Sequence, residues 1–156
     1  MAKKEEVVET GLYSASVSAA RAASLADLII SFSEREKPKR TMPRATAEAR
    51  LKATVNGKTA SQFLVAWDGD KALGFMLFTV CAGLAGEWAY LNDAHIPKGP
   101  RDAAVAKALL AALLDWAKAR GLERVGTSVE PKGDAMALCD EFGFTRDESV
   151  WREKFL

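Results

Sequence analysis

The chain has little of several features that identify common classes of protein. Only Cys81 and Cys139 are cysteines, and they stand far apart without a C-x-x-C spacing, so the sequence predicts neither a disulfide framework nor a zinc site. A net charge of +1 provides no overall field to attract nucleic acid or an anionic membrane. The longest apolar stretch, residues 103–114, is interrupted by Lys107, and the first residues hold no apolar signal core. We therefore expect a cytoplasmic protein that binds no membrane and no nucleic acid.

Several catalytic motifs are also missing. The sequence contains no nucleophile elbow, no Walker-type phosphate loop and no dinucleotide glycine fingerprint, and His95 is its only histidine. The sequence consists of 49% apolar and 28% charged residues, and it contains no repeats or low-complexity tracts. This composition predicts one globular domain, residues 1–156, with a full-sized core.

Basic residues are concentrated in residues 35–58. This segment holds eight lysines and arginines against Glu36 and Glu48, a balance of +6, while the rest of the chain sums to −5. A charge run of this kind usually forms a solvated surface.

The spacing of apolar residues predicts an alternation of helices and strands. Asp68-Gly69-Asp70 indicates a hairpin turn, and Asp134 is expected to cap the last helix. The predicted helices are 16–32, 45–55, 101–120 and 134–142, and the predicted strands are 5–10, 62–67, 72–80, 87–96, 122–129 and 150–156.

The segment 87–129 predicts a strand, a crossover helix and a second, parallel strand. Val105, Leu109 and Leu113 recur at helical spacing, and Gly121 follows the helix as its terminator. A helix in this position presents unpaired backbone N–H groups at its first turn, which favour an anion such as a phosphate.

The residues of this unit resemble the central motif of the GNAT superfamily of acyl-CoA-dependent N-acetyltransferases. Residues 90–96, YLNDAHI, are similar to the family strand YLEDLYV, and residues 101–106, RDAAVA, stand in the register of R/Q-x-x-G-x-G/A with Ala104 in place of the first glycine. Residues 132–144, KGDAMALCDEFGF, are similar to N-x-x-A-x-x-L-Y-x-x-x-G-F, with lysine and cysteine in place of asparagine and tyrosine.

The resemblance implies an α/β (α+β) fold in which helices flank a mixed, centrally splayed sheet, and it implies acetyl-CoA as co-substrate. It also implies a homodimer, because GNAT proteins are often dimers. The residues that it places at the cofactor are Ala94, His95, Ile96, Arg101, Asp102, Ala103, Ala104, Val105, Ala106 and Lys107.

Two residues are candidates for proton transfer. Related diamine acetyltransferases have Glu-Asp where this chain has Asn92-Asp93, and because asparagine cannot accept a proton, Asp93 remains as the candidate base. Cys139 stands where the family tyrosine protonates the leaving thiolate. Alternatives stay open at both positions: Asp93 could satisfy nearby backbone amides, and Cys139 could be a small packed hydrophobe. His95 is a further candidate base or a packed side chain.

These observations predict an enzyme that transfers an acetyl or other acyl group from the CoA thioester to a primary amine of a small molecule or protein. By resemblance the basic segment 35–58 borders the acceptor pocket, where it would disfavour a polyamine. The alternative is a GNAT-like domain that has lost catalysis and binds acyl-CoA or another partner, because Asn92, Ala104, Lys132 and Cys139 all depart from the family motifs.

Overall fold

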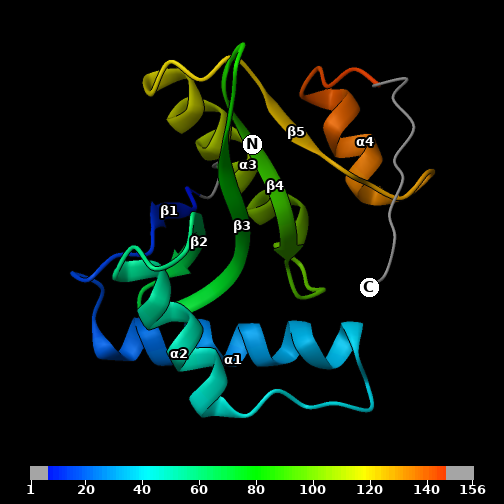
Figure 1. Cartoon of the computed structure of the whole chain (residues 1–156). Helices are drawn as coiled ribbons and strands as arrows, with labels where there is room; N and C mark the ends of the chain where they lie inside the picture. The colour runs from blue at the N-terminus through cyan, green and yellow to red at the C-terminus, as the bar shows by residue number, and fades with distance from the viewer. Residues whose placement is uncertain (1–6, 147–156) are drawn as a thin grey trace.

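The computed structural model describes residues 7–146, whose strands form one mixed sheet of order β1-β2-β3-β4-β5 (Figure 1). The first four strands are antiparallel neighbours, and the fifth is parallel to β4. The strands are β1 (Glu9–Leu12), β2 (Ser61–Asp68), β3 (Lys71–Gly83), β4 (Gly86–His95) and β5 (Val125–Thr127).

Helices cover both faces of this sheet. Alternation along β3 separates two cores, because Phe75 lies in one apolar cluster while Met76 and Phe78 lie in the other. The first cluster packs against α1 (Ala19–Glu36) and α2 (Arg44–Val55), and the second packs against α3 (Asp102–Ala119) and α4 (Asp134–Glu141). The resulting architecture confirms the predicted mixed α/β sheet flanked by helices.

The strand, crossover helix and strand unit is also confirmed, since α3 connects two parallel neighbours, β4 and β5. Gly121 ends α3 with a φ of +70°, as its position predicts. Three predictions need correction. The strand predicted over 122–129 pairs only over Val125–Thr127. Of the strand predicted over 5–10, residues 5 and 6 lie outside the described residues; the described strand begins at Glu9 and extends to Leu12. The predicted strand 150–156 lies outside the described residues.

The cap of α4 is the third correction. Gly133 is the N-cap residue, and Asp134 is the first residue of the helix. Because Asp134 lies one residue inside the helix, its carboxylate is not the cap, and it binds Nζ of Lys98 at 3.1 Å instead.

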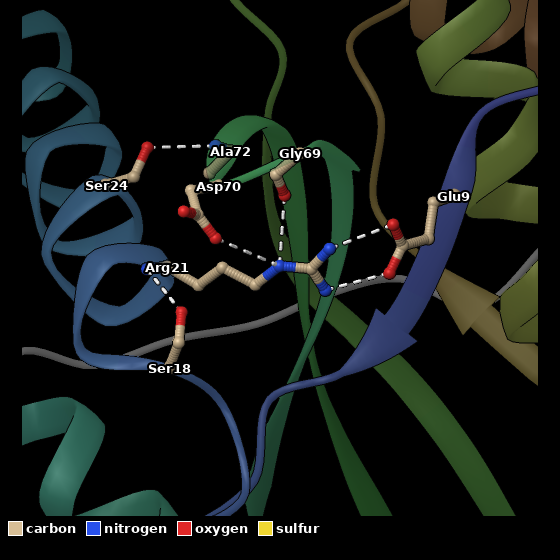
Figure 2. Close-up of polar contacts among 7 residues, drawn as sticks. All are labelled: Glu9, Ser18, Arg21, Ser24, Gly69, Asp70 and Ala72. Carbon is tan, nitrogen blue, oxygen red and sulfur yellow. Dashed lines mark hydrogen bonds and ion pairs between the residues drawn. The ribbon is translucent and has the colours of Figure 1, made fainter.

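Arg21 joins the start of α1 to β1 and to the turn of the β2–β3 hairpin (Figure 2). Its guanidinium binds both carboxylate oxygens of Glu9 at 2.8 and 2.9 Å, and its Nε donates to the carbonyl of Gly69 at 3.0 Å. The same group lies 4.9 Å from the ring centroid of Trp67. Ser24 accepts a hydrogen bond from the Ala72 N–H at 2.9 Å. These contacts fix the first turns of α1 against the sheet and so determine where its last turns lie.

Within residues 7–146, no helix is both long enough and apolar enough to cross a membrane.

Candidate active site

The sheet opens between β4 and β5. Their pairing extends only from Ala89↔Val125 to Leu91↔Thr127, whereas β4 remains paired with β3 as far as His95. Toward the carboxyl ends the two strands diverge (Figure 1). Within the described residues, the β5-facing edge of β4 is therefore unpaired from residue 92 onward. An open strand edge offers backbone N–H and C=O groups to an extended ligand.

A β-bulge lies at the point where the sheet opens. The register of β3 with β4 shifts between Leu77↔Asp93 and Phe78↔Leu91, which leaves Asn92 as the extra residue. An extra residue interrupts the alternation of side chains, so two consecutive residues share a face. Leu77 and Thr79 of β3 lie on the α1/α2 face; Leu77 pairs with Asp93, and Thr79 binds the side chain of Asn92. The bulge therefore presents Asn92 and Asp93 together on this face.

Asp93 is half-buried beneath the end of α1. Burial raises the pKa of its carboxyl, and the negative charge of Glu36 raises that pKa further, while Arg35 and Arg50 oppose the shift. A carboxylate with a raised pKa is better matched to accepting a proton from an amine. The environment of Asp93 therefore suits the role that the sequence predicts for it.

His95 lies on the same face, as alternation from Asp93 predicts, but it is buried, with 6% of its surface exposed. Its Nε2 lies 3.2 Å from the Ser31 hydroxyl of α1, and its ring centroid lies 5.8 Å from that of Phe32 and 6.1 Å from that of Phe75. Burial lowers the pKa of the imidazole, so the ring is neutral at pH 7. The His95 side chain is thus part of the packing between α1 and the sheet.

On the other face, the first turn of α3 lies close to the end of β4. Gly74 of β3 permits this approach, because a Cβ there would lie 2.9 Å from Cγ1 of Ile96 and 3.1 Å from Cγ1 of Val105. Val105 is buried by this packing, whereas Ala103 and Ala104 are exposed. The exposed start of the helix therefore lies beside the opening of the sheet, although the Asp102 N–H donates to the carbonyl of Gly99 and the Val105 N–H donates to that of Arg101.

Charged side chains surround this helix start. Nη1 of Arg101 binds Asp68 at 3.0 Å, and Lys107 binds Glu141 of α4 at 2.7 Å. The carboxylate of Asp102 accepts the N–H of Ala103 at 2.7 Å and lies 3.8 Å from Nζ of Lys98. An anion at the helix start must therefore compete with the negative charge of Asp102.

Cys139 is half-buried on α4. Leu138 and Phe142 of this helix pack against the α3 core, and the Lys107–Glu141 and Lys98–Asp134 pairs hold α4 beside α3. Burial raises the pKa of the Cys139 thiol, as does the nearby Asp140, so the thiol is protonated at neutral pH. Within residues 7–146 no hydrogen bond joins Cys139 to Asp93, and the two side chains lie on different elements.

The structure thus brings Asn92, Asp93 and His95 to one face of β4, and it places Arg101 to Lys107 at the opening from the other face. Sequence reasoning missed the bulge and the approach at Gly74, although a glycine within an apolar strand is a signal of close packing. It also missed the electrostatic influence of Arg35 and Arg50 on Asp93.

Comparisons with known proteins agree with this geometry. The model of the acetyltransferase (GNAT) family matches residues 23–144. A probable acetyltransferase has a similar structure at 17% identity, with 97% of each chain covered and a TM-score of 0.78. A ribosomal-protein-alanine N-acetyltransferase from Brucella melitensis biovar Abortus 2308 is 19% identical, with 96% of this chain and 100% of the other covered and a TM-score of 0.69.

An aminoglycoside acetyltransferase from an uncultured soil metagenomic sample, solved with sisomicin, is 18% identical, with 96% of this chain and 95% of the other covered and a TM-score of 0.73. At these identities the structures establish the fold alone. No curated protein sequence matches the chain significantly. The family match spans more than half of the sequence, and the chain therefore belongs to the GNAT acetyltransferase family.

Proposed function

We propose that the protein transfers an acetyl group from acetyl-CoA to a primary amine of a small molecule or protein. The observation that carries this proposal is the convergence of three features at the end of β4: an open strand edge, the exposed first turn of α3, and the half-buried carboxylate of Asp93. The co-substrate approaches from the α3 side and the amine from the α1/α2 side, so that they meet where the sheet opens.

The first turn of α3 would hold the CoA pyrophosphate. Its exposed residues, Ala103 and Ala104, leave the backbone accessible, and the helix dipole favours an anion there. Lys107 and Arg101 supply positive charge nearby, although both are paired with carboxylates in this structure. The edge of β4 at residues 94–96 would hydrogen-bond the extended arm of the co-substrate.

The chemistry would be direct attack of a neutral amine on the thioester carbonyl. A C–N bond forms, the C–S bond breaks, and the proton lost by the nitrogen passes to Asp93. Backbone N–H groups of β4 would stabilise the oxyanion. The leaving thiolate departs unaided or takes a proton from the Cys139 thiol, which is protonated at neutral pH.

A second candidate function is an acyl-CoA-binding or interaction module without catalysis. The observation that favours it is the Asp102 carboxylate, which occupies the N–H of Ala103 and opposes the binding of phosphate. Asn92, Ala104 and Cys139 add to it, because each departs from the residue that the family uses.

Acceptor choice, location and assembly belong to the same proposal. Six of the eight basic residues in 35–58 make no ion pair within the described part of the chain: Lys37, Lys39, Arg40, Arg50, Lys52 and Lys58. An uncompensated positive surface repels a polyamine. The basic surface lacks an aromatic stacking pattern, and so we propose no nucleic-acid partner. We propose a cytoplasmic homodimer, as in many GNAT proteins.

One preparation tests the proposal. Calorimetry measures the affinity for acetyl-CoA, and a thiol-release assay against a panel of amines then measures turnover. Binding with amine-dependent thiol release supports the enzyme. Binding without release from any amine supports the module, and absence of binding contradicts both.

A further inference from the structure

Three side chains form a hydrogen-bonded chain across β2, β3 and β4. The Ser61 hydroxyl lies 2.8 Å from that of Thr79, and Thr79 donates to Oδ1 of Asn92 at 2.7 Å. A threonine hydroxyl has one proton, and here Asn92 receives it, so Ser61 donates its own proton to Thr79. In this arrangement the oxygen of the Asn92 amide lies toward Thr79 of β3.

This orientation leaves the NH2 group of Asn92 available. Asn92 is exposed, and within residues 7–146 its Nδ2 has no hydrogen-bond acceptor. An amide NH2 carries two donors and no acceptor, so it binds an oxygen and cannot bind an ammonium group. Because the bulge places Asn92 on the same face as Asp93, these donors lie on the face from which a substrate reaches the Asp93 carboxylate.

Positively charged side chains near Asp93 would also favour a carboxylate on the acceptor. The Arg35 guanidinium lies 5.2 Å from the centroid of Phe32, whose ring packs against His95, so the last turns of α1 cover this face. Arg50 of α2 also acts on Asp93 electrostatically, and it makes no ion pair within the described residues. Arg35 is paired with Glu36 at 3.0 Å, whereas Arg50 has no ion-pair partner within the described residues and so contributes positive charge near Asp93.

We infer that the acceptor is a primary amine that also carries a carboxylate, and that the Asn92 amide recognises this carboxylate. The inference rests on the acyl transfer proposed above. Asp93 provides a carboxylate for the amine, while the Asn92 NH2 group provides donors for the carboxylate. A diamine would place its second ammonium against these donors, which costs binding free energy without compensation.

Two sources of this chemistry are possible, a small amino acid and the acidic N-terminus of a peptide. β-Alanine and 1,3-diaminopropane form a matched pair of small acceptors that differ mainly in carboxylate against ammonium. Two blocked tripeptides, Ala-Asp-Ala amide and Ala-Lys-Ala amide, form the corresponding peptide pair. The wild-type protein should prefer the carboxylated member by at least about tenfold in kcat/KM in one of these pairs.

Three variants test the roles of the residues. Asn92→Asp removes the donors and adds a negative charge, and it should abolish the preference within the favoured pair. Thr79→Val removes the hydroxyl that binds the Asn92 amide oxygen, and it should raise KM for the carboxylated acceptor while KM for the diamine is unaffected. Asn56→Asp, at the exposed end of α2, is the matched control and should change neither value.

The outcomes separate the two proposals. If acetyl-CoA binds and both members of each pair are acetylated equally, or the cationic member is preferred, the acceptor inference is wrong while the acyltransferase proposal stands. If the Asn92→Asp variant still prefers the carboxylated acceptor, other residues determine the selectivity and the proposed role of Asn92 is wrong. Thiol release from none of the four acceptors, although another amine is acetylated, also overturns the inference, and release from no amine at all overturns both proposals.

Discussion

The Ser31 hydroxyl of α1 lies 3.2 Å from Nε2 of His95 on β4, and it is the hydrogen-bond partner of a ring whose Nδ1 has none within residues 7–146. This contact joins the helix beside the proposed acceptor site to the strand that bears Asp93. Protonation of the buried imidazole would cost stability, because both ring nitrogens of a charged ring carry an N–H and only Nε2 has a hydrogen-bond partner within the described residues.

Acidification should therefore destabilise the fold through His95. Burial lowers the pKa of His95 below its ordinary 6.5, so the unfolded chain takes up this proton at a higher pH than the folded chain. Stability is retained above pH 6.5 and falls as the pH decreases toward the folded-state pKa. The measurement is the Tm of wild type and His95→Gln at pH 7.5 and 5.5. The variant should lose less between the two values, and an equal loss would contradict the prediction.

Asp93 should show the opposite linkage. Its pKa is raised by burial and by Glu36, so the folded chain holds this proton at a higher pH than the unfolded chain, and the ionised carboxylate costs stability at neutral pH. Asp93→Asn should raise the Tm at pH 7.5 and lower kcat by roughly 10² to 10⁴, with partial recovery at high pH, where the amine deprotonates unaided.

Affinity for acetyl-CoA should not change in this variant. Asp115→Asn, on α3 and remote from the site, is the control and should leave kcat unaltered. A variant that loses stability together with activity would indicate that Asp93 is a structural partner of backbone amides.

The fold could be predicted largely from the sequence, whereas the site could be predicted only in part. Helical spacing and terminal glycines determine α3, and Asp68-Gly69 determines the hairpin, because these signals are local. The consecutive polar residues Asn92 and Asp93 interrupt the alternation of YLNDAHI, but only the pairing with β3 shows that an extra residue lies there. The strand predicted over 122–129 shortens to three residues because the sheet opens there, which depends on tertiary packing.

Gly74→Ala should disturb the approach of α3 to β4. The new Cβ would lie 2.9 Å from Cγ1 of Ile96 and 3.1 Å from the carbonyl oxygen of His95, so these atoms must shift. Overpacking of this kind costs about 1–3 kcal/mol. We expect a lower Tm and weaker binding of acetyl-CoA by calorimetry.

Gly126→Ala on β5 is the matched control, because its Cβ would lie at an ordinary 3.5 Å from the Trp88 ring. Its affinity for acetyl-CoA should remain near that of the wild type. If Gly74→Ala binds acetyl-CoA as the wild type does, α3 does not need this close approach to hold the co-substrate.

Asp102 should weaken the binding of acetyl-CoA. Its carboxylate accepts the Ala103 N–H at 2.7 Å, and a phosphate at the helix start would meet both the occupied donor and a like charge. Asp102→Asn should therefore lower the Kd, and Ala104→Glu, which adds charge and bulk to the same turn, should raise it sharply. Calorimetry at two salt concentrations measures both, and the difference between the variants should shrink at higher salt. Identical affinities would exclude the first turn of α3 as the phosphate site.

Lys132 should be a local source of instability that the family residue relieves. It stands where the GNAT motif has asparagine, and its φ of +68° lies in the left-handed region, which costs an ordinary side chain about 1–2 kcal/mol and asparagine less. Lys132→Asn should raise the free energy of unfolding by roughly 0.5–1 kcal/mol. The measurement is chemical denaturation of wild type, Lys132→Asn and Lys132→Gly. Lys118→Asn, on the exposed surface of α3, is the control and should be slightly destabilising because asparagine is the poorer helix former. If the φ of Lys132 is the cause, Lys132→Asn and Lys132→Gly should both stabilise the protein. If both are slightly destabilising, as Lys118→Asn is expected to be, the prediction is wrong.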